Sequence, residues 1–223
     1  MYDVIVSGAR CAGSPLAMLL ARKGYKVLLV DRTTFPSNLP TSTHLIHQPG
    51  IARLKKWGLL ERLIGTGCPA IDHYHYDIGE FTLKGCPPPF EGAAVAYAPR
   101  RMVLDKLLVD AAVEAGAELR EGFTVEGLTT SGDTVTGIRG TIGNRHEMTE
   151  EAQIVIGADG PNSIVARHVK APEYNAMAPL MRTRFSYWSG VKIDGAEFYP
   201  YDYRLIYGWA PTTVSRWSGR TGH

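Results

Sequence analysis

Short apolar runs alternate with amphipathic stretches along the first part of the chain. Residues 2–7 and 26–30 each contain a continuous apolar run, which is typical of strands that are buried on both faces. The apolar positions of residues 15–22 predict a helix between them, with Pro15 in its first turn and Gly24 at its C-terminal end. Together these elements predict a βαβ unit with a parallel pair of strands.

The rest of the chain predicts two more helical segments and many strands. Apolar spacing predicts helices over residues 51–63, with a break at Gly58, and over residues 101–116. The predicted strands begin at residue 118 and run through 118–125, 128–139 with a turn at 131–133, 147–156 and 204–209. Aromatic alternation in residues 68–98 and beyond residue 172 predicts antiparallel strands, whereas residues 212–223 show no strand pattern.

Composition excludes some classes of function. The 223 residues are 44% hydrophobic and 21% charged with a net charge of +2, which gives no reason to expect a nucleic-acid or membrane partner. The three cysteines fit neither a zinc site nor a disulfide framework, so we expect reduced thiols in a cytoplasmic protein. No apolar stretch has the length of a transmembrane segment, and we expect no signal peptide.

The turn between the first strand and the first helix carries candidate chemistry. Residues 8–13 read Gly-Ala-Arg-Cys-Ala-Gly, and Asp31 ends the next strand. In the dinucleotide-binding fingerprint, glycines make the turn tight, admit the pyrophosphate and let the helix pack closely. Arg10 replaces the middle glycine, so we expect it to loosen or reroute this approach, or to contact a phosphate itself. The alternative is a turn whose glycines serve packing only.

A second glycine-rich motif identifies the dinucleotide. Residues 154–167, Ile-Val-Ile-Gly-Ala-Asp-Gly-Pro-Asn-Ser-Ile-Val-Ala-Arg, resemble the GADGxxSxVxR stretch of FAD-dependent oxidoreductases of the para-hydroxybenzoate hydroxylase and geranylgeranyl reductase type. The resemblance implies that Asp159 and Gly160 lie beside the FAD pyrophosphate and the route of the nicotinamide cofactor. A plain hairpin-to-helix turn, with Ser163 as the N-cap, is the alternative.

The start of the predicted helix 101–116 supports the same resemblance. Residues 101–105 match the family's Arg-x-x-Leu-Asp pattern, which implies that Arg101 lies against the ribityl and phosphate groups; a solvated arginine is the alternative. Val125 matches the position whose backbone touches adenine. The cofactor-binding residues implied by the resemblance are Gly8, Arg10, Cys11, Ala12, Gly13, Asp31, Arg32, Arg101, Val125, Asp159 and Gly160. Of these, we expect Cys11 to be a small buried filler rather than a redox thiol.

We therefore predict an α/β fold with two domains. Residues 1–66 and 97–172 would form a Rossmann-like FAD-binding domain with a parallel sheet and a β-meander. Residues 67–96 and 173–223 would form an incomplete antiparallel-sheet substrate lobe. By resemblance the function is that of an FAD-dependent oxidoreductase, an NAD(P)H-dependent monooxygenase of a small organic substrate. A geranylgeranyl-reductase-like double-bond reductase is the second enzyme hypothesis, and no side chain is assigned as catalytic.

Histidines outside these motifs carry weaker predictions. By resemblance, His44, His47 and Gln48 lie in a loop near the isoalloxazine ring, where proton handling and a solvated loop position are both open; the second is commoner. His73 and His75 alternate with tyrosines. A metal site needs carboxylate or cysteine ligands besides the histidines, and we expect no metal site here.

The end of the chain departs from the family pattern. The family's Gly-Asp motif, which holds the ribityl chain, has no counterpart between Pro172 and His223. A one-base shift from Ala210 permits an Asp-Gly turn followed by an apolar strand, so a frameshifted or truncated non-catalytic remnant is a further hypothesis. We accordingly expect weak or absent FAD binding by this polypeptide alone.

Overall fold

The chain packs as two compact units. The computed structural model describes residues 1–38, 42, 44–143, 146–177, 182–187, 192–201, 204–209 and 215–220. The first unit comprises Met1–Pro40 and Arg101–Tyr174, and the second comprises Thr41–Arg100 and Asn175–His223. Residues 41–66 and 97–100, which the sequence grouped with the nucleotide-binding part, thus fall in the second unit. The domain boundaries themselves stay a prediction.

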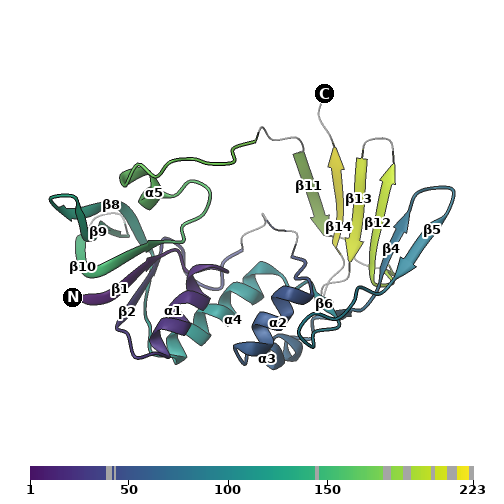
Figure 1. Cartoon of the computed structure of the whole chain (residues 1–223), viewed down its shortest axis with the longest axis horizontal. Coiled ribbons are helices and arrows are strands. Elements are labelled where there is room, and N and C mark those ends of the chain that lie inside the picture. The colour runs from purple at the N-terminus through teal and green to yellow at the C-terminus, as the bar shows by residue number, and fades with distance from the viewer. Residues whose placement is uncertain are drawn as a thin grey trace. The chain divides into compact units, whose positions relative to one another are not determined.

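The first unit is built on a six-stranded sheet in the order β7-β2-β1-β10-β9-β8 (Figure 1). Its strands are β1 (Tyr2–Ser7), β2 (Val27–Asp31), β7 (Glu118–Glu121), β8 (Phe123–Ser131), β9 (Thr134–Ile142) and β10 (His146–Gly157). The parallel part of the sheet contains β7, β2, β1 and the second half of β10. The first half of β10 pairs antiparallel with β9, which pairs antiparallel with β8, so these three strands form the β-meander. The predicted fold class is confirmed.

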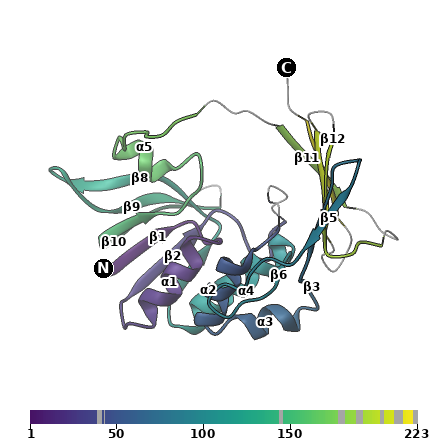
Figure 2. The ribbon, with the colours of Figure 1, turned by 45° about the vertical axis from the view of Figure 1, so that its right-hand side comes forward.

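Helices pack on this sheet, two of them where the apolar pattern predicts. These two, α1 (Gly13–Ala21) and α4 (Arg101–Glu114), lie side by side next to the parallel strands, and the short α5 (Ile164–His168) packs on β8 and β10 (Figure 2). Every residue of β2 is buried, as a strand covered on both faces requires. Tyr2, Ile5, Leu28, Val30, Phe123, Ile138 and Ala152 form one core cluster of the unit.

The segment predicted as one strand over residues 118–125 is two strands. Gly122 separates β7 from β8 and has φ +68°, a conformation that glycine adopts without steric cost. The turn lets β7 pair in parallel with β2 while β8 pairs antiparallel with β9. The prediction joined them because both segments favour strand.

The second unit contains a six-stranded sheet in the order β11-β14-β13-β12-β4-β5 and a two-stranded β3-β6 pair. The strands are β3 (Ala70–Ile71), β4 (Tyr74–Asp77), β5 (Thr82–Gly85), β6 (Ala96–Tyr97), β11 (Arg182–Tyr187), β12 (Ala196–Tyr201), β13 (Arg204–Trp209) and β14 (Ser215–Arg220). In the larger sheet β4 and β12 pair in parallel, and the other neighbouring strands pair antiparallel. Two helices, α2 (Gln48–Lys56) and α3 (Leu60–Gly65), flank Gly58 as predicted.

One prediction about the second unit is wrong. Residues 212–223 lack a strand pattern, yet Ser215–Arg220 forms β14 and pairs antiparallel with both β13 and β11. Backbone hydrogen bonds to two neighbouring strands define such a strand whatever its side-chain alternation. Among the described residues, no helix is long and apolar enough to cross a membrane.

Candidate dinucleotide-binding site

The glycine loop, residues 8–13, fits closely against the turn that follows β10. Gly8 has φ +102°, and a Cβ built on it would lie 2.4 Å from the carbonyl oxygen of Ala158. A Cβ on Gly13 would lie 1.8 Å from the carbonyl oxygen of Gly8. The Ala158 N–H also donates to the Ser7 carbonyl at 2.8 Å. Both outer glycines of the fingerprint therefore have a steric role.

The N-terminus of α1 is suited to an anion. Within α1, which the structure describes in full, the N-cap Ala12 makes no side-chain cap and the first turn has no acidic residue. The hydroxyl of Ser14 is buried and has no hydrogen-bond partner among the described residues. Unshared N–H groups and the helix dipole favour a phosphate at such a position. This arrangement fits a pyrophosphate.

Asp31 shapes the loop beside this helix end. Its Oδ2 accepts a hydrogen bond from the Ala9 N–H at 2.9 Å. Its Oδ1 accepts from the N–H and the hydroxyl of Thr33 at 2.9 and 2.7 Å. A carboxylate offers about four acceptor positions, so one remains for a ribose hydroxyl. Arg32, its neighbour, is exposed.

A buried carboxylate that the sequence analysis did not count among the site residues connects the loop to α4. Asp105 is fully buried and accepts hydrogen bonds from Arg10 Nη1 at 2.8 Å and from Arg101 Nε and Nη2 at 2.9 and 3.0 Å. Arg10 also donates to Thr33 Oγ1 at 3.2 Å, and its guanidinium lies 5.5 Å from the centroid of the Phe35 ring. Arg10, which replaces the middle glycine of the fingerprint, thus points toward Asp105 of α4. The only sequence signal for Asp105 was its place in the Arg-x-x-Leu-Asp pattern.

The Asp105 cluster (Arg10, Arg101 and Asp105) carries a formal charge of +1 beside the glycine loop. The arginine side chains are 21% and 13% exposed, so their charge is only partly screened by water. Burial alone would lower the pKa of Arg101, but its hydrogen bonds to Asp105 raise it overall. The Arg101 guanidinium thus stays charged, and the net formal positive charge of the cluster favours a phosphate nearby.

Cys11 contacts the Asp105 cluster. The residue is exposed, so the expectation of a buried filler is wrong. Its Sγ donates to Asp105 Oδ1 at 3.4 Å, and desolvation of this sulfur raises its pKa from 9.0 to about 11. Because the thiolate is the reactive form, Cys11 should carry about 100-fold less thiolate at pH 8 than a thiol of pKa 9. We expect iodoacetamide to label the exposed Cys86 first in the native chain, as peptide mass spectrometry would show. Equal labelling in denaturant is the control, and faster native labelling of Cys11 than of Cys86 would contradict the raised pKa of Cys11.

The turn after β10 is capped and also leaves an acceptor free. Asp159 Oδ2 accepts from the Ile164 N–H at 2.8 Å, and Ser163 Oγ caps α5 by accepting from the Ala166 N–H at 3.0 Å. Asp159 Oδ1 is buried and has no hydrogen-bond partner in the part of the chain that the structure describes. A buried acceptor without a partner costs about 1–3 kcal/mol. Asp159 Oδ1 is therefore available to a ligand hydroxyl, and Gly160 beside it is exposed.

Val125 lies at an irregularity of β8. Val125 pairs with Gly140 and Gly127 pairs with Arg139, which leaves Glu126 as an extra residue between them. A bulge of this kind interrupts the hydrogen-bond ladder and redirects the strand locally. The adenine contact that the resemblance implies for Val125 stays a prediction.

The loop histidines lie in the second unit. His44 is 4% exposed, so the expectation of a solvated position is wrong for it: φ of +61° turns the chain, and its Nε2 lies 2.7 Å from the Tyr187 hydroxyl. The Arg100 guanidinium lies 4.5 Å from the centroid of the Tyr187 ring. His47 Nδ1 lies 3.0 Å from the Tyr74 hydroxyl.

A parallel sheet, a glycine loop after its first strand and an aspartate at the end of the next define a dinucleotide-binding domain. The chain belongs to the FAD binding domain family, whose model matches residues 1–198. FAD is the cofactor of that family. The uncapped α1 fits its pyrophosphate, and Asp159 Oδ1, which has no hydrogen-bond partner among the described residues, fits a hydroxyl of the cofactor.

Known proteins resemble this chain over most of its length. The digeranylgeranylglycerophospholipid reductase of Methanosarcina mazei is 32% identical over 171 residues, 74% of this chain and 39% of that protein. The aklavinone 12-hydroxylase DnrF of Streptomyces peucetius subsp. caesius is 29% identical over 184 residues, 73% and 36% of the two chains. A solved flavoprotein/dehydrogenase from Cytophaga hutchinsonii has a TM-score of 0.87 at 19% identity, covering 98% of this chain and 55% of that one. The chain spans about two fifths of the length of its curated relatives.

Proposed function

We propose that this chain forms the ADP-binding half of the FAD site of an NAD(P)H-dependent monooxygenase that acts on a small organic substrate. The observation that carries the proposal is the glycine loop, which ends in the uncapped α1 and packs against the turn that holds Asp159. Cys11 and Ala12 of the loop and Arg32, which follows β2, are also implied cofactor-binding residues and lie in the same unit.

Each element of the site has a separate role in this proposal. The α1 N–H groups and the net charge of the Asp105 cluster hold the pyrophosphate, and Asp31 accepts a hydrogen bond from a ribose hydroxyl. Asp159 Oδ1 accepts from a further hydroxyl of the cofactor. When bound, the flavin supplies electron transfer from NAD(P)H and reactivity toward oxygen, while the chain supplies binding and orientation.

Reduction of a carbon–carbon double bond is the second candidate. It is supported by the relative that is named a digeranylgeranylglycerophospholipid reductase, whereas the relative named aklavinone 12-hydroxylase supports hydroxylation. Oxygen consumption coupled to NADPH oxidation, measured with FAD added, supports the monooxygenase. Substrate reduction that continues without oxygen supports the reductase instead.

An Asp31→Asn substitution should weaken ADP binding at least about tenfold, since an amide cannot accept at both positions that a carboxylate serves. Isothermal titration of the tag-free chain with ADP and with FAD measures this effect. Because the residues assigned here surround the ADP portion, we expect ADP and FAD to bind the unchanged chain with affinities within about tenfold, about 1.4 kcal/mol.

Asp133→Asn, in the exposed turn between β8 and β9, is the matched control and should leave ADP binding unchanged. A chain that is folded by circular dichroism but binds no ADP would contradict the proposed site. ADP binding without turnover would support the hypothesis of a non-catalytic remnant over either enzyme.

A further inference from the structure

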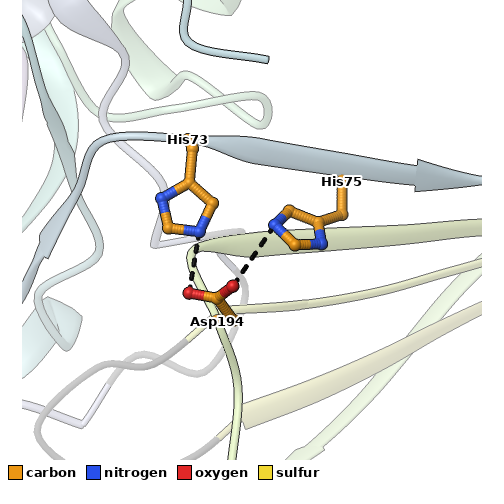
Figure 3. Close-up of side chains that lie close together, drawn as sticks. All are labelled: His73, His75 and Asp194. Carbon is orange, nitrogen blue, oxygen red and sulfur yellow. Dashed lines mark hydrogen bonds and ion pairs between the residues drawn. The ribbon is translucent and has the colours of Figure 1, made fainter. Parts of the chain in front are cut away.

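The second unit holds a cluster of titratable side chains that the proposed function does not use. His73 precedes β4, His75 lies within it, and Asp194 lies two residues before β12. His73 Nε2 is 2.8 Å from Asp194 Oδ1, and His75 Nε2 is 3.5 Å from Asp194 Oδ2. Figure 3 shows both imidazole rings turned toward the one carboxylate. We call these three residues the His–Asp cluster.

Strand pairing fixes this arrangement. Residues two apart on a strand point to the same face, which places His73 and His75 together with ring centroids 5.0 Å apart. β12 runs parallel to β4, and the Ala196 N–H donates to the His73 carbonyl at 3.0 Å. Gly195 has φ +71°, and a Cβ on it would lie 2.4 Å from the same carbonyl oxygen. This close passage of the backbone brings Asp194 to the histidines.

His73 has a carboxylate at each of its ring nitrogens. Nδ1 is hydrogen-bonded to Asp72 Oδ1, and Nε2 faces Asp194. A neutral imidazole carries one N–H and can donate to only one of them. When Nδ1–H donates to Asp72, the lone pair of Nε2 is directed at a carboxylate oxygen. A second proton or a bound cation resolves that contact.

His75 supplies independent evidence for a cation. Its Nε2 is buried and, apart from the 3.5 Å contact with Asp194 Oδ2, has no partner that meets hydrogen-bond geometry among the residues that the structure describes; the side chain is 20% exposed. A buried ring nitrogen that makes no hydrogen bond is costly. A single metal ion would satisfy this nitrogen and the lone pair of His73 together.

We propose that His73, His75 and Asp194 bind one divalent transition-metal ion, with Zn²⁺ as the ion of choice. One ligand atom from each residue lies within 4.8 Å of the other two, and two imidazoles with one carboxylate suit Zn²⁺. Asp72 would orient His73 through its other ring nitrogen, as carboxylates do for metal-ligating histidines. Three protein ligands leave one position for water, which reaches the site because the Asp194 side chain is 64% exposed.

The ion would join segments that are distant in the sequence. Asp194 is 121 residues from His73 in the sequence, and the fold brings its carboxylate to the histidines. The expectation of no metal site assumed that such a carboxylate was missing, so that assumption does not hold. The Lys84 ammonium now lies 3.1 Å from Asp194 Oδ2 and competes for the carboxylate; its side chain is 56% exposed and can turn into water. The metal would thus link the start of β4 to the segment before β12.

The test uses the tag-free, chelator-treated full chain, titrated calorimetrically with Zn²⁺ and spectroscopically with Co²⁺. We expect one equivalent to bind and to raise the melting temperature. His73→Gln and His75→Gln should each abolish this binding, and Asp72→Asn should lower the affinity about 10- to 100-fold. His146→Gln, an exposed histidine of β10, is the matched control and should bind as the unchanged chain does.

Circular dichroism confirms that each variant is folded before it is titrated. Binding that survives the His73→Gln/His75→Gln double substitution would overturn the proposal, as would a folded, unchanged chain that takes up no Zn²⁺ or Co²⁺. Lys84→Gln removes the competing ammonium without touching a ligand, so it should bind Zn²⁺ at least as tightly. Weaker binding by Lys84→Gln would count against the site.

Discussion

Replacing Asp105 by asparagine should lower the free energy of unfolding by about 3–5 kcal/mol, because it leaves two arginines without their buried counter-charge. Asp105 is fully buried and receives hydrogen bonds from Arg10 and Arg101. Asparagine keeps the size of the side chain but removes its charge, so the loss reports electrostatics rather than packing. Urea denaturation followed by circular dichroism measures it.

Asp110→Asn is the matched control on the same helix. Asp110 pairs with Lys106 four residues earlier, with both side chains 42% exposed, and exposed pairs of this kind contribute about 0.3–0.5 kcal/mol. If Asp105→Asn costs no more than Asp110→Asn, the buried cluster does not stabilise the unit. We also expect Asp105→Asn to weaken ADP binding, because the loop residue Arg10 loses its contact with α4.

Gly8→Ala should destabilise the first unit by about 3 kcal/mol and abolish measurable ADP binding. The methyl group would lie 2.4 Å from the backbone oxygen of Ala158, and a backbone atom cannot rotate away as a side chain can. The φ of +102° adds strain for any residue with a Cβ. Urea denaturation gives the stability, and calorimetric titration gives the ADP affinity.

Gly132→Ala separates these two contributions. Gly132 lies in the turn between β8 and β9 with φ +58°, and a Cβ built there would meet no other atom of the described residues within 4 Å, its chain neighbours aside. It should cost only the strain of the positive φ, about 1 kcal/mol. An equal loss in the two variants would show that the close fit between Gly8 and Ala158 has no energetic weight.

Elements with a local signal were predicted well from the sequence. The apolar runs of β1 and β2 and the amphipathic α1 and α4 lie within a residue or two of their predicted bounds. Asp31 ends β2 as expected. Each of these features depends on periodicity or on a turn residue within a short window, and such windows are readable without knowledge of the distant chain.

Features that depend on distant contacts were missed. The hydrogen bond from Arg10 to Asp105 spans 95 residues, and no local pattern indicates that a loop arginine will meet a particular carboxylate of a later helix. His44 is buried because it meets Tyr187, 143 residues later. β14 is held by its neighbours rather than by its own alternation. In each case, tertiary packing overrides the local tendency.

The dual pairing of β10 has a consequence for the order of folding during synthesis. The first half of β10 can join the β8–β9 hairpin through contacts between residues that are close in sequence. The second half must pair with β1, where Ile154 lies opposite Val4. Contacts of such long sequence separation form late. The edge of β1 that pairs with β10 therefore has unpaired backbone groups until residue 157 has been synthesised. Unpaired apolar strand edges promote association with other chains. Nascent chains shorter than this should depend on chaperones.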